Sequence, residues 1–414
     1  WLAVDFDVVE QSVKILQNRI VKAKLASRTR MVKHLQKLLV KSLNARILAV
    51  KRVSENKGKK TAGVDGILLD TNIKKSICVN DLKIKIADYK SKPLKRIEIP
   101  KKNGKTRPLG IPTMFDRSIQ ALYKLAIEPI AECIADKNSY GFRPKRSTQD
   151  AMKQIWLCTS KQNGAEWILE ADIKGCFDNI SHQWLYDNIP LDNRLLKQWL
   201  KSGFIKDDTL FPTDSGTPQG GIISPILANM VLDGIEQIVK NHKTRFQKME
   251  NGVILYRHTN RLNFIRYADD FVVTGRTQED LQLVQKDIET FLSIRGLELS
   301  KEKTHITNIN DGFDFLGFNF RKYPNKKIIV KPTKSGIQSF KDKIKEIFKK
   351  YNSSSLTMLI SKLNPLLRGW ANYYRFVNSK VIFSKLDTYI WRKSLNWMKR
   401  IHQRRETIKY YKQY

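Results

Sequence analysis

The sequence has few acidic residues for its size, and this shortage is the first guide to its partners. Its 414 residues include 76 lysines and arginines but only 40 aspartates and glutamates, a formal net charge of +36. So large a positive excess favours a polyanionic partner, and nucleic acid is the most common one. Hydrophobic residues make up 41% of the chain, which excludes a disordered basic tail and allows roughly two to four folded domains.

Long hydrophobic runs are also missing. No apolar stretch approaches the roughly 18–20 residues of a membrane-spanning helix. The N-terminus has no signal-peptide pattern, so a membrane is not an expected partner. The first residue is tryptophan rather than methionine, which indicates that the sequence is trimmed.

Cysteine and histidine are scarce. The four cysteines show neither the short spacing of a zinc knuckle nor the density of a disulfide scaffold. The six histidines form no H-x-x-x-H pair, which argues against a histidine-bound metal. These patterns favour a reducing, intracellular environment.

One short stretch carries the clearest chemical signal. Two β-prone runs flank Ala268-Asp269-Asp270, which predicts a tight hairpin with both aspartates at its tip. Adjacent carboxylates are tolerable if they are solvated, or useful if they share a divalent cation with a third carboxylate. Mg²⁺ takes one or two carboxylates and keeps positions open for phosphate oxygens. A polar turn without a metal is the alternative, since aspartate is common in turns.

Other segments could complete such a site. Asp172 ends an apolar strand before the chain turns through Gly175 into a helix, which makes it a candidate third carboxylate or a simple cap. A hairpin over 94–112 carries Lys101 and Arg107, cations suited to a triphosphate or a nucleic-acid backbone. The glycines of 216–221 allow close backbone approach to a ligand, and a helix is expected over 222–240.

Basic amphipathic helices are expected at both ends of the chain. The first two cover 7–26 and 28–53; their bases form either an ordinary solvated face or a phosphate-facing surface. Three more cover 335–350, 355–368 and 379–400, where aromatic residues serve either as core or as part of an RNA-binding surface.

Strands and helices interleave between residues 94 and 330, the pattern of an α+β sheet domain. A loop over 139–147 mixes aromatic and basic residues and suits single-stranded or template contacts. Short strands are expected around Lys301 and Lys303, and an aromatic-rich strand over 313–320.

Together these stretches resemble the reverse transcriptases encoded by group II introns, the intron maturases. The matching motifs occur in order and cover nearly the whole chain: IPK at 99–101, TRPLGIP at 106–112, SYGFRP at 139–144, DIKGCFD at 172–178, GTPQGG at 216–221, YADD at 267–270, EKT at 302–304, FLGF at 315–318 and LNPLLRGWANYY at 363–374. So many ordered matches leave little room for chance.

The resemblance implies a right-hand polymerase of α+β class, with fingers and an antiparallel palm sheet followed by an α-helical thumb or maturase (X) domain. It divides the chain into a basic helical extension (1–60), fingers and palm (61–330) and thumb (331–414), the last with its C-terminal end open to truncation. Many members of the family continue into a DNA-binding segment and an HNH-type endonuclease. Neither occurs in these 414 residues, so target-strand cleavage is not predicted for them.

The resemblance also implies roles for individual residues. The three aspartates would be the catalytic carboxylates around two Mg²⁺ ions, with the Ile173 carbonyl as a further ligand and Lys303, or its neighbour Lys301, as proton donor to pyrophosphate. The other implied residues are Lys101, Arg107, Phe177 and Gln219 for the nucleotide, with Phe177 excluding a 2′-hydroxyl; Phe315, Leu316, Gly317 and Phe318 for the primer grip; and Arg28, Arg30, Lys33, Lys37, Lys41, Arg143, Arg368 and Arg375 for RNA.

The implied activity is RNA-directed DNA synthesis, together with maturase binding of the intron RNA that assists splicing and retrohoming by target-primed reverse transcription. The implied partners are group II intron RNA, target DNA, an RNA template with its DNA primer, and dNTPs, in a bacterial cytoplasm or an organelle. The alternatives are a reverse transcriptase of a retron, CRISPR or phage-defence system, and a splicing-only maturase. The 363–374 motif favours the intron type, and the presence of all three aspartates favours an active enzyme.

Overall fold

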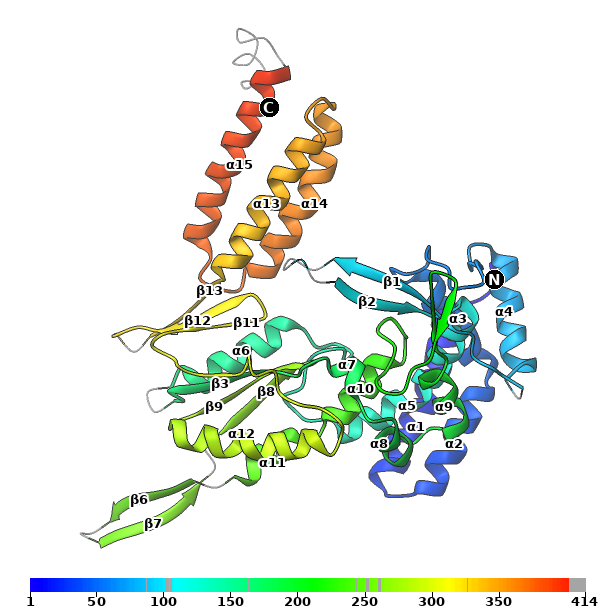
Figure 1. Ribbon diagram of the computed structural model, residues 1–414, viewed down its shortest axis with the longest axis horizontal. Coiled ribbons are helices and arrows are strands. Elements are labelled where there is room, and N and C mark those ends of the chain that lie inside the picture. Colours follow the sequence, from blue (N-terminus) through cyan, green and yellow to red (C-terminus); the bar gives the residue numbers. More distant parts are fainter. Residues whose placement is uncertain are drawn as a thin grey trace.

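The computed structural model describes residues 1–86, 88–100, 104, 106–161, 164–242, 244–250, 253–259, 262–325 and 327–401. Helices form one flank of the molecule, a central sheet the middle, and a helical tower the top (Figure 1). This mixture of separate helical and sheet regions agrees with the predicted α+β class.

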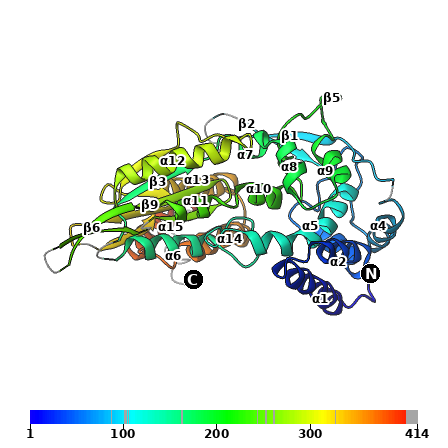
Figure 2. The same cartoon turned by 90° about the horizontal axis from the view of Figure 1, so that it is seen from below.

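The N-terminal flank is built around one long helix. Helices α1 (Phe6–Leu25), α2 (Thr29–Lys41) and α3 (Leu43–Glu55) pack against α5 (Met114–Ile134), and α4 (Asn72–Ile84) covers the outer side (Figures 1 and 2). The single helix predicted over 28–53 is wrong, because Ser42 takes an extended conformation (φ −66°, ψ 133°) between α2 and α3. The break lets α2 bury one apolar stripe while α3 is buried over most of its circumference.

A smaller sheet lies beside this flank. Its strand order is β2 (Thr106–Ile111), β1 (Leu94–Pro100), β4 (Phe204–Lys206) and β5 (Thr209–Phe211). β1 and β2 form the predicted antiparallel hairpin, with Arg107 opposite Ile99. Three short helices follow β3 along the chain, α7 (Cys176–Asn179), α8 (His182–Asn188) and α9 (Asn193–Leu200). α7 lies between this sheet and the central one, and α8 and α9 lie below it (Figure 1).

The central sheet is antiparallel throughout, with strand order β10 (His305–Asn308), β3 (Trp167–Asp172), β9 (Asp270–Gly275) and β8 (Asn263–Tyr267). Its two faces contribute to different cores: Ile168 and Val272 pack with α6 (Thr148–Thr159), whereas Leu169 and Val273 pack with α12 (Gln278–Ser293). Burial of both faces explains why these strands read as continuous apolar runs.

Two predictions in this region are wrong in detail, one of a helix and one of short strands. The helix expected over 222–240 is divided into α10 (Ser224–Leu232) and α11 (Ile235–Asn241) by Gly234, whose φ of 109° does not continue a helix. Residues 301–303 form a turn rather than strands, and β10 begins only at His305.

The strand expected over 313–320 is a hairpin of β11 (Phe313–Phe315) and β12 (Phe318–Lys322), because Leu316 and Gly317 both have positive φ. β13 (Ile328–Pro332) extends this small sheet. Another hairpin, β6 (Thr244–Glu250) and β7 (Val253–Thr259), projects from the far end (Figure 1).

The tower consists of α13 (Lys334–Lys350), α14 (Leu356–Tyr374) and α15 (Lys380–Ile401), and it stands on the β11–β13 sheet (Figure 1). Trp370, Tyr374 and Trp397 pack inside it or at its base, whereas Trp391 is exposed. Most aromatic residues of this region therefore serve as core.

Candidate active site

The end of β3 and the start of β9 lie side by side in the central sheet, and each carries an aspartate. In their antiparallel register, Asp172 is the direct Cα partner of Asp270. Asp269 precedes it in the two-residue turn that joins β8 to β9. Directly opposed residues of an antiparallel pair have neighbouring side chains. The structure therefore brings the three predicted carboxylates together, although Asp172 is far from the other two in sequence.

The turn that carries Asp269 has a backbone that its surroundings hold in place. Ala268 has a φ of 60°, a left-handed conformation that residues other than glycine seldom adopt. The loop before α6 packs directly on it, and a Cβ atom on Gly141 would overlap the Ala268 nitrogen. The Tyr140 nitrogen also donates to the Arg266 carbonyl at 2.9 Å.

Burial raises the pKa values of Asp269 and Asp270. It raises the pKa of Asp270 to about 7, and the nearby carboxylates of Asp269 and Asp172 add to the effect. Burial raises the pKa of Asp269 too, while Arg107 and Lys303 act in the opposite direction. Nζ of Lys303 lies 2.6 Å from Oδ2 of Asp172, and this hydrogen bond raises the lysine's pKa. Negative charge is thus only partly compensated here, which favours a bound cation.

The donor set fits a hard divalent cation. Carboxylate oxygens are the ligands that Mg²⁺ takes from proteins, usually one or two carboxylates together with water and substrate phosphates. Within the part of the chain that the structure describes, no group of three or more histidine, cysteine or acidic side chains is arranged to hold a metal ion. Water or phosphate oxygens would therefore have to complete the coordination of an ion bound by the aspartates.

Asp270 should make the metal-free fold sensitive to pH. An unfolded aspartate has a pKa of about 3.9, whereas that of Asp270 is about 7. Between these values the folded chain binds more protons than the unfolded one, so this carboxyl makes the fold less stable as pH rises from about 4 to 7. We expect Asp270→Asn to raise the melting temperature in EDTA at pH 7.5 by roughly 2–4 °C.

Thermal melts between pH 5 and pH 8 measure this effect. The matched control is Asp207→Asn, which changes an exposed aspartate beyond β4 and should leave the pH dependence as in the parent chain. Mg²⁺ should stabilise the parent chain more than Asp270→Asn. Parallel pH curves for the parent and Asp270→Asn would contradict the assignment of the raised pKa.

A chain of hydrogen bonds joins β2 to the glycine-rich loop before α10. Nε of Arg107 donates to Oε1 of Gln219 at 2.7 Å, and Nε2 of Gln219 donates to both carboxylate oxygens of Asp178 at 3.1 Å. The Gly110 nitrogen donates to the Gln219 carbonyl at 2.8 Å. Arg107 and Gln219 are thus brought together beside the aspartates, whereas Lys101 lies outside the described residues.

The turn after β3 places Ile173 and Phe177. Gly175, with a φ of 52°, is the N-cap at which the chain enters α7, as predicted. Both side chains are buried, and the Phe177 ring meets Phe142 edge-on at 6.2 Å. The Phe177 carbonyl accepts a hydrogen bond from the Thr217 nitrogen at 2.6 Å, which fixes the glycine-rich loop against α7.

The predicted primer-grip residues occupy the β11–β12 hairpin. Phe315 and Phe318 are buried in the core beneath the tower, so their rings do not face solvent. The Leu316 and Gly317 carbonyls accept hydrogen bonds from the hydroxyls of Tyr373 and Tyr374, at 2.8 and 3.1 Å. Beside this turn lies a hollow of about 510 Å³ bounded by α13 and α14. Only the turn between the two rings is placed to meet a ligand.

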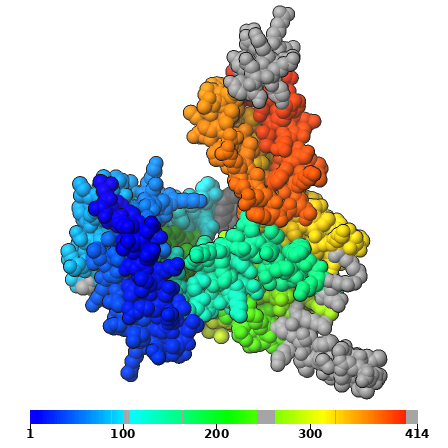
Figure 3. Space-filling model, turned by 180° about the vertical axis from the view of Figure 1, so that it is seen from behind, coloured from blue at the N-terminus to red at the C-terminus, as the bar shows by residue number. Residues whose placement is uncertain are grey.

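The predicted RNA contacts divide into exposed and buried groups. The exposed ones lie on α2 and its N-terminal side and at the end of α14: Arg28, Arg30, Lys33, Lys37, Lys41, Arg368 and Arg375. These helices lie in two parts of the molecule that are separated by a notch (Figure 3).

Arg143 differs from the other predicted RNA contacts, because it is buried. Its guanidinium pairs with the Glu132 carboxylate at 2.6 Å and donates to the carbonyls of Asp136 and Ser139. Every nitrogen that could meet a phosphate is thus engaged or enclosed, and the prediction of Arg143 as an RNA contact is corrected to an internal one.

Three stretches of the sequence each match a known protein family. Residues 99–320 match the reverse transcriptase (RNA-dependent DNA polymerase) family, and residues 1–82 match the N-terminal domain of reverse transcriptase. Residues 337–414 match the group II intron maturase-specific domain.

The chain belongs to the group II intron-encoded reverse transcriptases. It is an RNA-directed DNA polymerase with a maturase region for intron RNA, so the predicted family, right-hand α+β fold and activity are confirmed. The maturase match supports the intron type over the retron, CRISPR and phage-defence alternatives.

The chain is also similar to individual known proteins. The group II intron-encoded protein LtrA of Lactococcus lactis is 30% identical over 441 residues, covering 86% of this chain and 72% of LtrA. Protein YkfC of Escherichia coli is 32% identical over 292 residues, covering 63% of this chain and 76% of YkfC. Among solved structures, telomerase from Candida albicans aligns with a TM-score of 0.41 and 15% identity, over 77% of this chain and 58% of that one.

The described helices of this reverse transcriptase include none that is long and apolar enough to span a bilayer.

Sequence reasoning missed two residues at the site. Asp178 had a usable signal, as the last residue of the DIKGCFD motif. Arg266, next to the YADD motif, had only the weak signal of a charge within an otherwise apolar strand.

Proposed function

We propose that this reverse transcriptase joins dNTPs to a primer 3′-hydroxyl with Asp172, Asp269 and Asp270 as ligands of two Mg²⁺ ions and the Ile173 carbonyl as a further ligand. The observation that carries the proposal is the direct pairing of Asp172 with Asp270 beside the Asp269 turn. The raised pKa of Asp270 supports it, because a carboxylate cluster that resists ionisation alone gains most from a cation.

When bound, the ions would activate the 3′-hydroxyl and stabilise the leaving pyrophosphate. The remaining steps depend on the chain's own groups. Arg107, held by Gln219 near the aspartates, would bind the triphosphate together with Lys101. Lys303 donates a hydrogen bond to Asp172, which supports its ammonium as the group that would protonate pyrophosphate. This ion pair favours Lys303 over Lys301.

The buried ring of Phe177 would exclude a ribose 2′-hydroxyl from the nucleotide pocket. We expect Phe177→Val to lower the discrimination between dCTP and CTP by about 10- to 200-fold, because the smaller side chain leaves room for the hydroxyl. The measurement is the ratio of kcat/KM for the two nucleotides in single-nucleotide extension.

The control for this change is Phe211→Val, at an exposed position on β5. It should leave the ratio of kcat/KM unchanged. If Phe177→Val also leaves the ratio unchanged while dCTP incorporation continues, Phe177 does not select the sugar.

The same chain would bind its intron RNA through the exposed bases of the N-terminal helices and of α14, and so assist splicing and retrohoming by target-primed reverse transcription. The template RNA, primer, target DNA and dNTPs would meet in the notch between these parts (Figure 3). The free cysteines suit a reducing bacterial cytoplasm or organelle.

Primer extension on an RNA template tests the core of this proposal. Labelled product should appear only with dNTPs and Mg²⁺, and EDTA should abolish it. Splicing of the intron RNA in the same preparation tests the maturase role separately. Product that forms equally well in EDTA would refute the two-metal mechanism.

A further inference from the structure

A fully buried arginine lies directly beneath the turn that carries the aspartates. Arg266 is on β8, between apolar neighbours, and has no solvent exposure. Enclosing a guanidinium in a core is costly unless its partners compensate for lost hydration. Because the burial of Arg266 is unfavourable by itself, we expect this residue, two positions before Ala268, to have a specific role.

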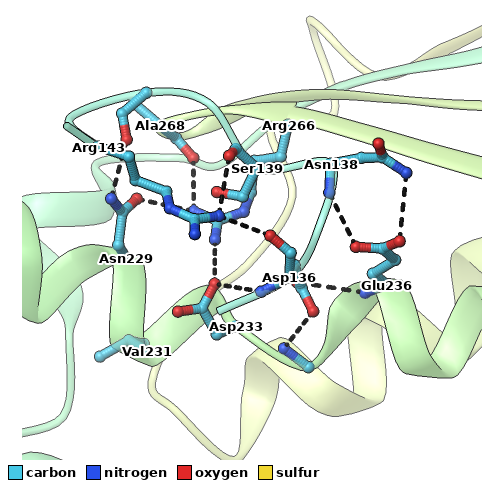
Figure 4. Close-up of polar contacts among 12 residues, drawn as sticks. Asp136, Asn138, Ser139, Arg143, Asn229, Val231, Asp233, Glu236, Arg266 and Ala268 are labelled. Carbon is cyan, nitrogen blue, oxygen red and sulfur yellow. Dashed lines mark hydrogen bonds and ion pairs between the residues drawn. The ribbon is translucent and has the colours of Figure 1, made fainter. Parts of the chain in front are cut away.

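The guanidinium joins the turn to two residues of the α10 region (Figure 4). One terminal nitrogen, Nη1, donates to the Ala268 carbonyl at 3.2 Å and to Oδ1 of Asn229 at 3.0 Å. The other, Nη2, donates to Oδ1 of Asp233 at 2.6 Å. The planar fork of one arginine therefore spans the strand-end turn and the residues that end α10.

The same partners clamp the turn from its other side. Nδ2 of Asn229 donates to the Gly141 carbonyl at 2.8 Å, and Gly141 packs on the Ala268 nitrogen. Ala268 is therefore held between the Arg266 guanidinium below it and the 140–141 backbone beside it. Its left-handed φ of 60° is maintained by this clamp rather than by intrinsic preference.

Two buried aspartates, Asp233 and Asp136, hold Arg266 in place. Asp233 accepts from the Asp136 nitrogen as well as from Arg266, and Asp136 accepts from the nitrogens of Gly234 and Glu236 (Figure 4). Burial raises the pKa of Asp233 to about 6, although Arg266 opposes this change. The anchor is a dense polar network, in which little movement of the guanidinium is allowed.

We propose that Arg266 is a positioning residue, whose hydrogen bond to the Ala268 carbonyl fixes the turn that presents Asp269 and Asp270 to metal and nucleotide. The inference rests on the proposed function of these aspartates. It assigns Arg266 no contact with substrate, and it assigns Asn229 and Asp233 to the support of Arg266.

Arg266→Lys is the direct test. Lysine keeps the positive charge beside Asp233, but its single nitrogen cannot span Asp233 and the Ala268 carbonyl as the fork does. We expect kcat for primer extension to fall about 10- to 100-fold, the usual effect of losing a hydrogen bond that holds metal ligands in position. The Mg²⁺ concentration for half-maximal rate should rise by about 10-fold or more. The dNTP KM at saturating Mg²⁺ and the affinity for intron RNA should stay close to those of the parent.

The control is Arg46→Lys, at a buried arginine that bonds to the Val79 carbonyl between α3 and α4, remote from the turn. It should lower the melting temperature without changing the Mg²⁺ requirement. If Arg266→Lys fails to fold, Asn229→Ala removes a weaker part of the clamp and should show the same Mg²⁺ effect, but a smaller one.

The outcomes separate this inference from the proposed function. A folded Arg266→Lys, or a folded Asn229→Ala, with the parent's kcat and Mg²⁺ requirement overturns the positioning role. So does a loss of activity that merely follows the melting temperature, as in Arg46→Lys. If Asp269→Ala also keeps full activity, the proposed active site fails first; if Asp269→Ala is inactive, only the role of Arg266 is refuted.

Discussion

Replacing Asp269 by alanine should lower the rate of primer extension by about 10³-fold or more, equivalent to at least ~4 kcal/mol of lost transition-state stabilisation. The side chain lies in the turn beside the Asp172–Asp270 pair, where burial already disfavours its negative charge. Its removal would leave two carboxylates to hold ions that three are proposed to share. Asp172→Asn should have an effect of similar size, because that residue is paired directly with Asp270.

Single-turnover extension of a DNA primer on an RNA template measures this effect. Asp207→Ala, an exposed position in the β4–β5 turn, is the matched control and should extend at the parent's rate. The melting temperature of Asp269→Ala should not fall, since the change removes a buried, poorly compensated carboxylate. Full extension by Asp269→Ala would show that the active site lies elsewhere.

Intron splicing should survive the same substitution. The bases proposed to bind intron RNA are on α2 and α14, away from the aspartates. Asp269→Ala should therefore bind the RNA with unchanged affinity and promote splicing at the parent's rate. Loss of both functions in a folded variant would mean that one surface serves both, contrary to the proposed division.

Local sequence patterns predicted much of the structure. The β-prone runs on both sides of Asp269 and Asp270 predicted their hairpin, and Gly175 marked the turn after β3. The convergence of Asp172 with this hairpin had no local signal. It depends on β3 pairing with β9 across a long sequence separation, and only the resemblance to a known family supplied it.

The errors share a cause, which is that tertiary packing decided the local conformation. Ser42 breaks a continuous helical pattern because α2 and α3 bury different faces. The positive φ of Leu316 turns an apparent strand into a hairpin, which the hydroxyls of Tyr373 and Tyr374 support from α14. Gly317 is a local signal for such a turn, but the apolar pattern of residues 313–320 favoured a continuous strand.

The sequence also did not reveal which charged residues are buried. Arg143 and Arg266 occur in a chain with a large excess of bases, and in the sequence they resemble the residues exposed on α2. The structure separates them: Arg143 pairs with Glu132, and Arg266 pairs with Asp233. Composition predicted a polyanionic partner, but not which bases are free to meet it.

Affinity for intron RNA should fall by roughly 3 × 10²- to 2 × 10⁴-fold between 50 and 200 mM salt if six to ten phosphates are bound, because each neutralised phosphate releases condensed counterions. The chain has a formal net charge of +36, and the bases of α2 lie exposed on the face opposite Val32, Leu35 and Leu39. A log–log plot of the association constant against salt should have a slope of about −0.7 for each phosphate that the protein neutralises.

Lys33→Gln with Lys37→Gln tests whether α2 contributes to this slope. Both lysines are exposed and one turn apart, so the pair should reduce the slope by about 1.4 if both meet phosphates. The matched control is Lys206→Gln in β4, an exposed lysine outside the proposed RNA surface. If the double variant keeps the parent's slope, the basic face of α2 is only solvated. A nearly flat slope in the parent would extend that conclusion to most of the positive charge and would leave RNA recognition to interactions that do not release ions.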